Sequence, residues 1–200
     1  YTETRKIRRR GERLPPLDLL DDEDLNRPSE KEIRENAKII QESLADFDID
    51  VEVVGVKVGP SVTQYAVQPY IEKADDAGNL YLQRVRVSRI ASLAGDLALA
   101  LEAKRLRIQA PVPGTSYVGI EVPNRRPSLV RMRALLESEA FHSVNAPLAV
   151  PLGRDVSGAP VVTNLASLPH LLMGGTTGSG KSVAINAMVT ALVMNNTPAD

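Results

Sequence analysis

The chain has 200 residues, of which 43% are hydrophobic, and its 24 basic and 25 acidic side chains give a formal net charge of −1. This length allows one large domain or two smaller ones, and the balanced charge argues against a nucleic-acid surface over the whole chain. Cysteine is absent, His142 and His170 are far apart, and no run of eighteen apolar residues occurs, so we expect a soluble chain without disulfides, metal clusters or transmembrane helices.

Residues 1–28 read as a linker and docking segment. Basic side chains dominate residues 1–13, and we favour a solvated linker here over an arm that binds nucleic acid or a membrane surface. Residues 14–20 (LPPLDLL) contain a Pro-Pro pair that blocks a helix, and their leucines are expected to dock onto a neighbouring surface. The acidic residues between 18 and 24 are expected to be solvated.

Residues 29–140 have the pattern of a compact α+β domain with its own core. Ser29 and Glu32 form a capping-box signature, and Ile33, Ile40 and Phe47 share one face of the helix that follows. Alternation and turn residues predict the other elements. These are strands at 51–58, 61–68, 80–87, 106–110 and 117–122, helices at 88–104 and 129–140, and a polar loop at 73–79.

A break at 142–147 precedes a different kind of segment, residues 145–200. A hairpin is predicted from strands at 149–152 and 159–162 around a turn at 155–158. The apolar run 170–174 predicts a buried strand, and apolar spacing of three or four residues predicts a helix over 182–195.

The junction between that strand and that helix fits the phosphate-binding pattern G-x-x-x-x-G-K-[ST] without a mismatch. Its glycines are expected to take positive φ and to let backbone N–H groups approach an anion, at the positive end of the helix. Lys181 would bind the β- and γ-phosphates and the Ser182 hydroxyl would coordinate Mg²⁺, so these two are the predicted catalytic residues. The predicted ATP-binding residues are Gly175, Thr176, Thr177, Gly178, Ser179, Gly180, Lys181 and Ser182.

An acidic residue at the end of an apolar strand, which such ATPases use to hold Mg²⁺ and position water, is not found after Ser182. The chain also begins at Tyr1 rather than Met and ends at Asp200, shortly after the predicted helix. We therefore expect a truncated piece of a larger protein, inactive as an ATP hydrolase by itself.

Several stretches together resemble the motor region of the FtsK/SpoIIIE family of bacterial DNA translocases. The matching stretches are 14–20, 53–69, 85–124 and 151–182, the last of which contains PHLLMGGTTGSGKS. The polar residues 75–81 depart from the expected family pattern and are interpreted as an outward-facing insertion.

This resemblance implies an α-subdomain at 29–140 that assembles the ring and the start of a RecA-like P-loop domain at 145–200. It further implies a homo-hexamer that encircles double-stranded DNA and pulls it with ATP during chromosome segregation at cell division. The parent protein would be anchored at the cytoplasmic face of the inner membrane by segments outside this sequence. Two alternatives stay open: a P-loop ring ATPase of a secretion or conjugation system, and, for the isolated chain, a non-catalytic assembly module.

Overall fold

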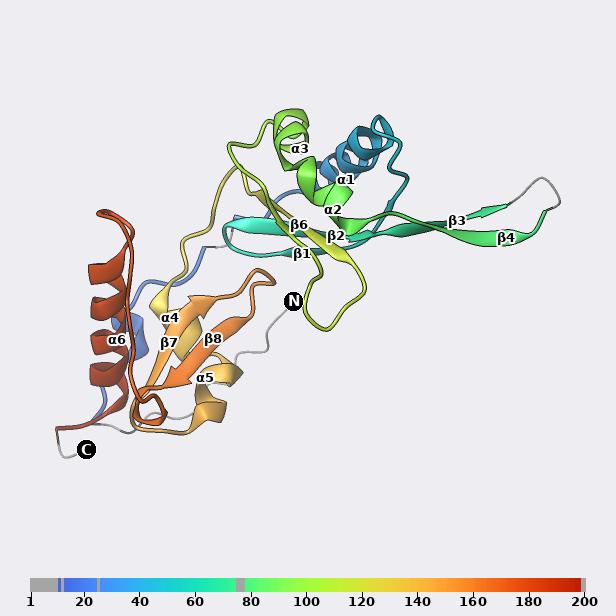
Figure 1. Ribbon diagram of the computed structural model, residues 1–200. Helices are drawn as coiled ribbons and strands as arrows, with labels where there is room; N and C mark the ends of the chain where they lie inside the picture. Colours follow the sequence, from blue (N-terminus) through green and yellow to red (C-terminus); the bar gives the residue numbers. More distant parts are fainter. Residues whose placement is uncertain (1–10, 12, 25, 75–77, 199–200) are drawn as a thin grey trace. The chain divides into compact units, whose positions relative to one another are not determined.

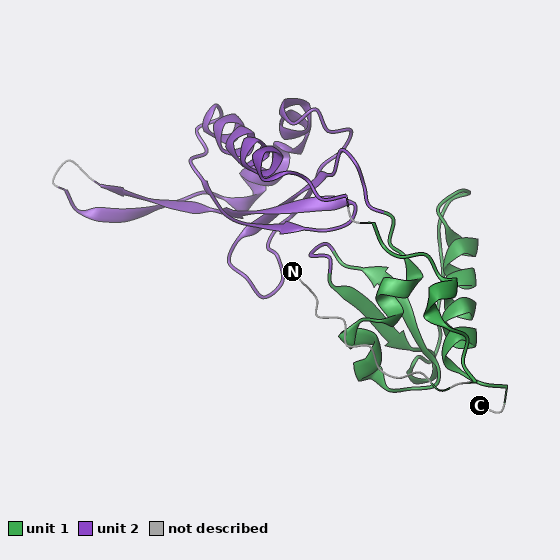
Figure 2. Cartoon of the chain, turned by 180° about the vertical axis from the view of Figure 1, so that it is seen from behind, with its two compact units in different colours: residues 1–25, 129–155, 159–200 green, residues 26–128, 156–158 purple. Residues whose placement is uncertain are grey.

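The computed structural model describes residues 11, 13–24, 26–74 and 78–198. The expected basic linker at 1–13 lies almost wholly outside these residues. The chain divides into two compact units, which Figure 2 colours separately. Unit 1 contains residues 1–25, 129–155 and 159–200, and unit 2 contains residues 26–128 and 156–158. Unit 2 is therefore inserted into the sequence of unit 1.

Unit 2 is built on an antiparallel sheet of four strands in the order β1-β2-β6-β5. The strands are β1 (Glu52–Val58), β2 (Val62–Gln68), β5 (Arg107–Gln109) and β6 (Val118–Pro123). The predicted hairpin is confirmed: Gly59 donates its N–H to the Val62 carbonyl at 2.9 Å across the turn. Strands β2 and β6 are buried almost throughout, so they form the centre of the sheet.

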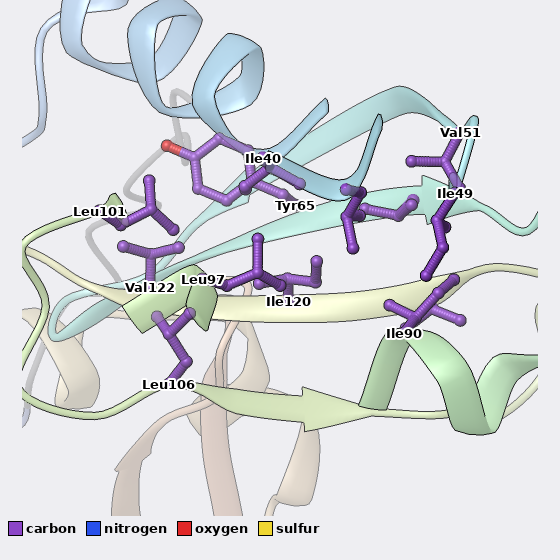
Figure 3. Close-up of a cluster of buried hydrophobic side chains, with 13 residues drawn as sticks. Ile40, Ile49, Val51, Tyr65, Ile90, Leu97, Leu101, Leu106, Ile120 and Val122 are labelled. Carbon is purple, nitrogen blue, oxygen red and sulfur yellow. The ribbon is translucent and has the colours of Figure 1, made fainter. Parts of the chain in front are cut away.

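Three helices lie on one face of this sheet and bury its core (Figures 1 and 3). They are α1 (Glu30–Ala45), α2 (Val87–Ser92) and α3 (Ala94–Ala100). The Ser29 hydroxyl accepts a hydrogen bond from the Glu32 N–H at 3.2 Å, which confirms the predicted N-cap. Ile40 and Leu44 are fully buried, whereas Phe47, expected on the same face, is 44% exposed because α1 ends before it. The single helix expected at 88–104 is two short helices that meet at Leu93.

A second, two-stranded sheet extends from the main one (Figure 1). It pairs β3 (Tyr70–Ala74) with β4 (Leu80–Arg84), so the strand expected at 80–87 is present but shorter. Strand β3 was not predicted, because its sequence YIEKA alternates weakly between apolar and polar residues. Lys73 on β3 pairs with Asp50 at 2.6 Å and ties the hairpin to the start of β1.

Unit 1 has a smaller core, formed around a hairpin and the last helix. Its elements are α4 (Met132–Leu136), α5 (Glu139–Val144), β7 (Ala149–Arg154), β8 (Pro160–Asn164) and α6 (Lys181–Asn195), with short 3-10 helices at Leu17–Leu19 (η1) and Leu165–Ser167 (η2). Leu136 and Phe141 share this core with Val150 and with Ala191 of α6. Residues 129–140 therefore pack with the P-loop segment, which differs from the domain range expected from the sequence.

Residues 14–24, here named the strap, also belong to unit 1. Leu17 and Leu20 pack against its core, as expected for docking leucines. The acidic residues Asp18, Asp21, Asp22 and Asp24 are exposed, as expected, and Asp21 pairs with Arg131 at 2.8 Å. Glu23 departs from the prediction, because its side chain is buried against Arg154. Sequence spacing cannot reveal such pairs, because the partners lie more than a hundred residues away.

The buried strand predicted at 170–174 is not formed. In the described part of the chain, β7 and β8 pair only with each other, and residues 170–174 are extended without strand pairing. Leu172 is 95% exposed and Leu171 50% exposed. An apolar run predicts burial, but a strand also needs a partner for its backbone hydrogen bonds. Within the described ranges, no helix has both the length and the apolar composition needed to cross a bilayer.

Candidate functional site

The predicted phosphate loop joins the extended segment before it to the first turn of α6. Gly178 has a φ of 80° and Gly180 a φ of 90°, a region that favours glycine, and Gly180 is the N-cap of α6. The loop is folded on itself: the Ser179 N–H donates to the Thr176 carbonyl at 3.2 Å. The positive φ expected for these two glycines is therefore present.

Gly175 is required for a different reason than the one predicted. Its φ is not positive, but a Cβ built on it would lie 2.3 Å from the Ser179 hydroxyl oxygen and 3.2 Å from the Ser179 Cβ. The loop thus curves so tightly that its first residue and Ser179 leave no room for a side chain between them.

The ammonium group of Lys181 lies inside this curve. It donates to the carbonyl oxygen of Gly175 and to that of Thr176, the latter at 2.7 Å, and lies 3.5 Å from the Ser179 hydroxyl. A lysine ammonium has three donors and no acceptor, so it can exchange these carbonyls for phosphate oxygens. The loop residues 174–180 are solvent-exposed, which leaves that exchange open to a ligand from solution.

Ser182 is exposed on the first turn of α6, next to Lys181. The first N–H groups of a helix have no partner within the helix and attract anions. The loop residues 175–180, Lys181 and Ser182 therefore lie together at the N-terminal end of α6. The chemistry of this set, cationic and rich in N–H donors with one hydroxyl, fits a nucleoside triphosphate with its Mg²⁺ ion.

The two histidines lie outside this loop. His142 belongs to α5 and its ring meets that of Phe141 edge-on at a centroid distance of 6.1 Å. His170 is exposed in the extended segment. Among the residues that the structure describes, no three His, Asp or Glu side chains are grouped so as to hold a metal ion.

Comparison with protein families assigns both halves of the chain. The model of the FtsK alpha domain matches residues 14–124, and that of the FtsK/SpoIIIE family matches residues 131–200. The chain belongs to the FtsK/SpoIIIE family. The resemblance noted from the sequence is therefore confirmed, as is its fold class: an α+β domain followed by the start of the family's motor domain.

Several relatives of this chain are named DNA translocase FtsK. The protein of Lactiplantibacillus plantarum is 51% identical over 166 residues, 83% of this chain and 19% of the relative. That of Staphylococcus aureus strain Mu50 is 44% identical over 186 residues, 92% of this chain and 22% of the relative. That of Clostridium tetani is 41% identical over 190 residues, 94% of this chain and 24% of the relative. The chain thus spans about a fifth of the length of these FtsK relatives.

A solved structure of the pCW3 conjugation coupling protein TcpA, in monomer form with ATPγS, is a weaker match. It is 14% identical, with a TM-score of 0.34 over 79% of this chain and 42% of that chain.

Proposed function

We propose that the chain is the ATP-binding part of a motor that moves double-stranded DNA. The observation that carries this proposal is the position of the Lys181 ammonium, held against the carbonyls of Gly175 and Thr176 at the start of α6. Membership of the FtsK/SpoIIIE family supports it, because the relatives are named DNA translocases.

In this proposal each loop residue has a separate task. Amides between Thr176 and Gly180 wrap the phosphates, Lys181 neutralises the β- and γ-phosphates, and the Ser182 hydroxyl holds Mg²⁺. When bound, Mg²⁺ supplies positive charge between the phosphates. Lys181 and Ser182 are then the catalytic residues of this chain for ATP hydrolysis.

The two units would divide the work. Unit 2 would act as the α-subdomain that assembles a homo-hexameric ring, and unit 1 would begin the RecA-like domain that turns ATP hydrolysis into movement. We propose further that the complete protein works in chromosome segregation at cell division, from the cytoplasmic face of the inner membrane. Family membership supports these assignments.

Replacement of Lys181 by Ala tests the nucleotide site. Titration with a fluorescent ATP analogue is expected to show binding by the unchanged protein and loss of binding by Lys181→Ala, with unit 2 still folded by circular dichroism. Lys104→Ala, which removes an exposed lysine of unit 2, is the matched control and should bind normally. Equal affinity in Lys181→Ala and Lys104→Ala would refute the assignment.

The DNA substrate is tested separately, in the natural full-length form of the protein. Its ATPase rate is expected to rise with double-stranded DNA, and the stimulation should fall as salt rises because sequence-independent pulling relies on phosphate contacts. Stimulation by single-stranded DNA alone would favour the conjugation-type alternative. No stimulation by either would favour an assembly role.

A further inference from the structure

The strap packs on the same core as the helix that carries the nucleotide loop. Leu17 and Leu20 lie in one apolar cluster with Ala191 and Met194, the two buried residues of α6. Met188 and Leu192, on the same helix, border that cluster. Because α6 begins at Lys181, a single continuous helix connects the residues around the strap leucines to the proposed phosphate site.

An ion pair between Glu23 and Arg154 also holds the strap, in addition to the apolar contacts of its leucines. The Glu23 carboxylate accepts two hydrogen bonds from the Arg154 guanidinium, at 3.2 and 2.7 Å, and only 3% and 9% of these two side chains is exposed. Arg154 ends β7, and β7 packs against α6. The strap is thus joined to β7, which packs against α6, by an ion pair. Its leucines also contact the apolar core to which α6 contributes.

In the described part of the chain, α6 contributes two buried side chains, Ala191 and Met194, to the core of unit 1. Large apolar side chains on the rest of the helix are exposed in the described part of the chain, with 70% of Val183, 54% of Val189 and 59% of Val193 accessible. Two of the residues that border its core, Leu17 and Leu20, come from the strap. The strap therefore borders the same core that α6 contacts through Ala191 and Met194.

We propose that the strap is a positioning element of the nucleotide site: Leu17, Leu20 and Glu23 hold α6 so that Lys181 and Ser182 meet the phosphates. The affinity of the loop for nucleotide then depends on whether the strap is seated. This inference rests on the proposed function, since it concerns the same loop. It also assigns residues 14–24 to the P-loop unit, whereas the matched family model places them with the alpha domain.

A pair of neighbouring leucines provides the test, in the natural full-length protein. Leu20→Ala removes a strap leucine of the core, and Leu19→Ala removes one that is 70% exposed on the same turn. We expect Leu20→Ala to raise the Kd for a fluorescent ATP analogue by about 2- to 30-fold, the range of couplings carried through packed elements. Leu19→Ala should leave the Kd unchanged.

Hydrogen exchange measured without nucleotide gives a second readout. Leu20→Ala is expected to increase the exchange rate of the α6 amides, whereas Leu19→Ala is expected to leave that rate unchanged. Titrations are run well below the melting temperature, because a purely structural role would lower Tm and leave the Kd of the folded protein unchanged. If Leu20→Ala does not fold, Glu23→Gln, which keeps the shape of the side chain, decides by the same titration.

The outcomes separate the two proposals. If the unchanged protein binds no nucleotide, the proposed function fails. If it binds and a folded Leu20→Ala or Glu23→Gln variant binds equally well, the strap is not a positioning element and this inference is overturned.

Discussion

Glu23 and Arg154, 131 residues apart in the chain, are joined by two hydrogen bonds in a buried ion pair. Removing one partner of such a pair leaves the other charge in a poorly solvated place. We therefore expect Glu23→Ala to lower the free energy of unfolding of unit 1 by about 3–5 kcal/mol, measured by urea denaturation.

Asp18→Ala is the matched control, because Asp18 is an exposed carboxylate of the same strap. It should change the free energy of unfolding by less than about 0.5 kcal/mol. Replacing Glu23 and Arg154 together by Met should cost less than Glu23→Ala alone, since no charge is then left buried. Similar costs for Glu23→Ala and Asp18→Ala would contradict the burial of this pair.

The contact between Gly175 and Ser179 allows a test that distinguishes two reasons for a glycine in the loop, namely a steric clash and a positive φ. Gly175→Ala is expected to weaken nucleotide binding, because its Cβ would lie 2.3 Å from the Ser179 hydroxyl oxygen. Adding Ser179→Gly removes that clash and should restore part of the affinity. Gly178→Ala, where φ is 80° and nothing lies within 4 Å of the added Cβ, should not be rescued by Ser179→Gly. Fluorescent nucleotide titration of the four variants distinguishes these cases.

Tyr65 gives unit 2 a dependence on alkaline pH. Burial raises the pKa of its phenol above the ordinary value of 10.0, nearby Asn36 lowers it in part, and the Glu32 carboxylate raises it further. The hydroxyl makes no hydrogen bond of ordinary geometry with any described residue. Because the folded state binds the phenolic proton more tightly, the stabilisation is complete below pH 10.0 and is lost as pH rises through the raised pKa.

Tyr65→Phe is therefore expected to reduce the loss of unfolding free energy between about pH 8 and about pH 11, measured by urea denaturation. At neutral pH it should cost less than about 1 kcal/mol, since the removed hydroxyl makes no regular hydrogen bond. Tyr81→Phe, at a tyrosine that is 49% exposed, is the comparison variant. If both variants have the same pH profile as the unchanged protein, the burial argument is wrong.

Ser29 caps α1, and its loss should be felt throughout unit 2. Ser29→Ala removes the acceptor of the Glu32 N–H and is expected to cost about 1 kcal/mol of unfolding free energy. Ser29→Asp keeps an acceptor at the N-terminus of the helix and should retain most of the stability. Thermal denaturation of both variants measures the difference, and equal melting temperatures would rule out the cap.

Much of unit 2 could be predicted from the sequence because its elements follow local patterns. Alternation at 51–68 predicted the β1–β2 hairpin, and the Ser29 cap predicted where α1 begins. Strand β3 was not predicted, because its sequence YIEKA has no clear alternation of apolar and polar residues. Its position is determined by backbone pairing with β4 rather than by burial of one face. Local pattern therefore succeeds where one face of an element is buried and fails where neither is.

In unit 1 the sequence predicted the loop and helix of the candidate site but not their surroundings. The motif indicated the positive φ of Gly178 and Gly180, yet the reason for Gly175 is a contact with Ser179 that only the folded loop reveals. The apolar run at 170–174 predicted a strand that has no pairing partner in the described part of the chain. The Glu23–Arg154 pair is a long-range contact, which no single-sequence pattern encodes.

The insertion of unit 2 between the strap and the rest of unit 1 sets an order of events during translation. A ribosome that adds about 5–20 residues per second needs on the order of ten seconds to travel from Glu23 to Arg154. In that interval residues 26–128, which make up unit 2 apart from residues 156–158, are synthesised before Arg154, the partner of Glu23. The Glu23–Arg154 ion pair can thus form only after residues 26–128 have been synthesised.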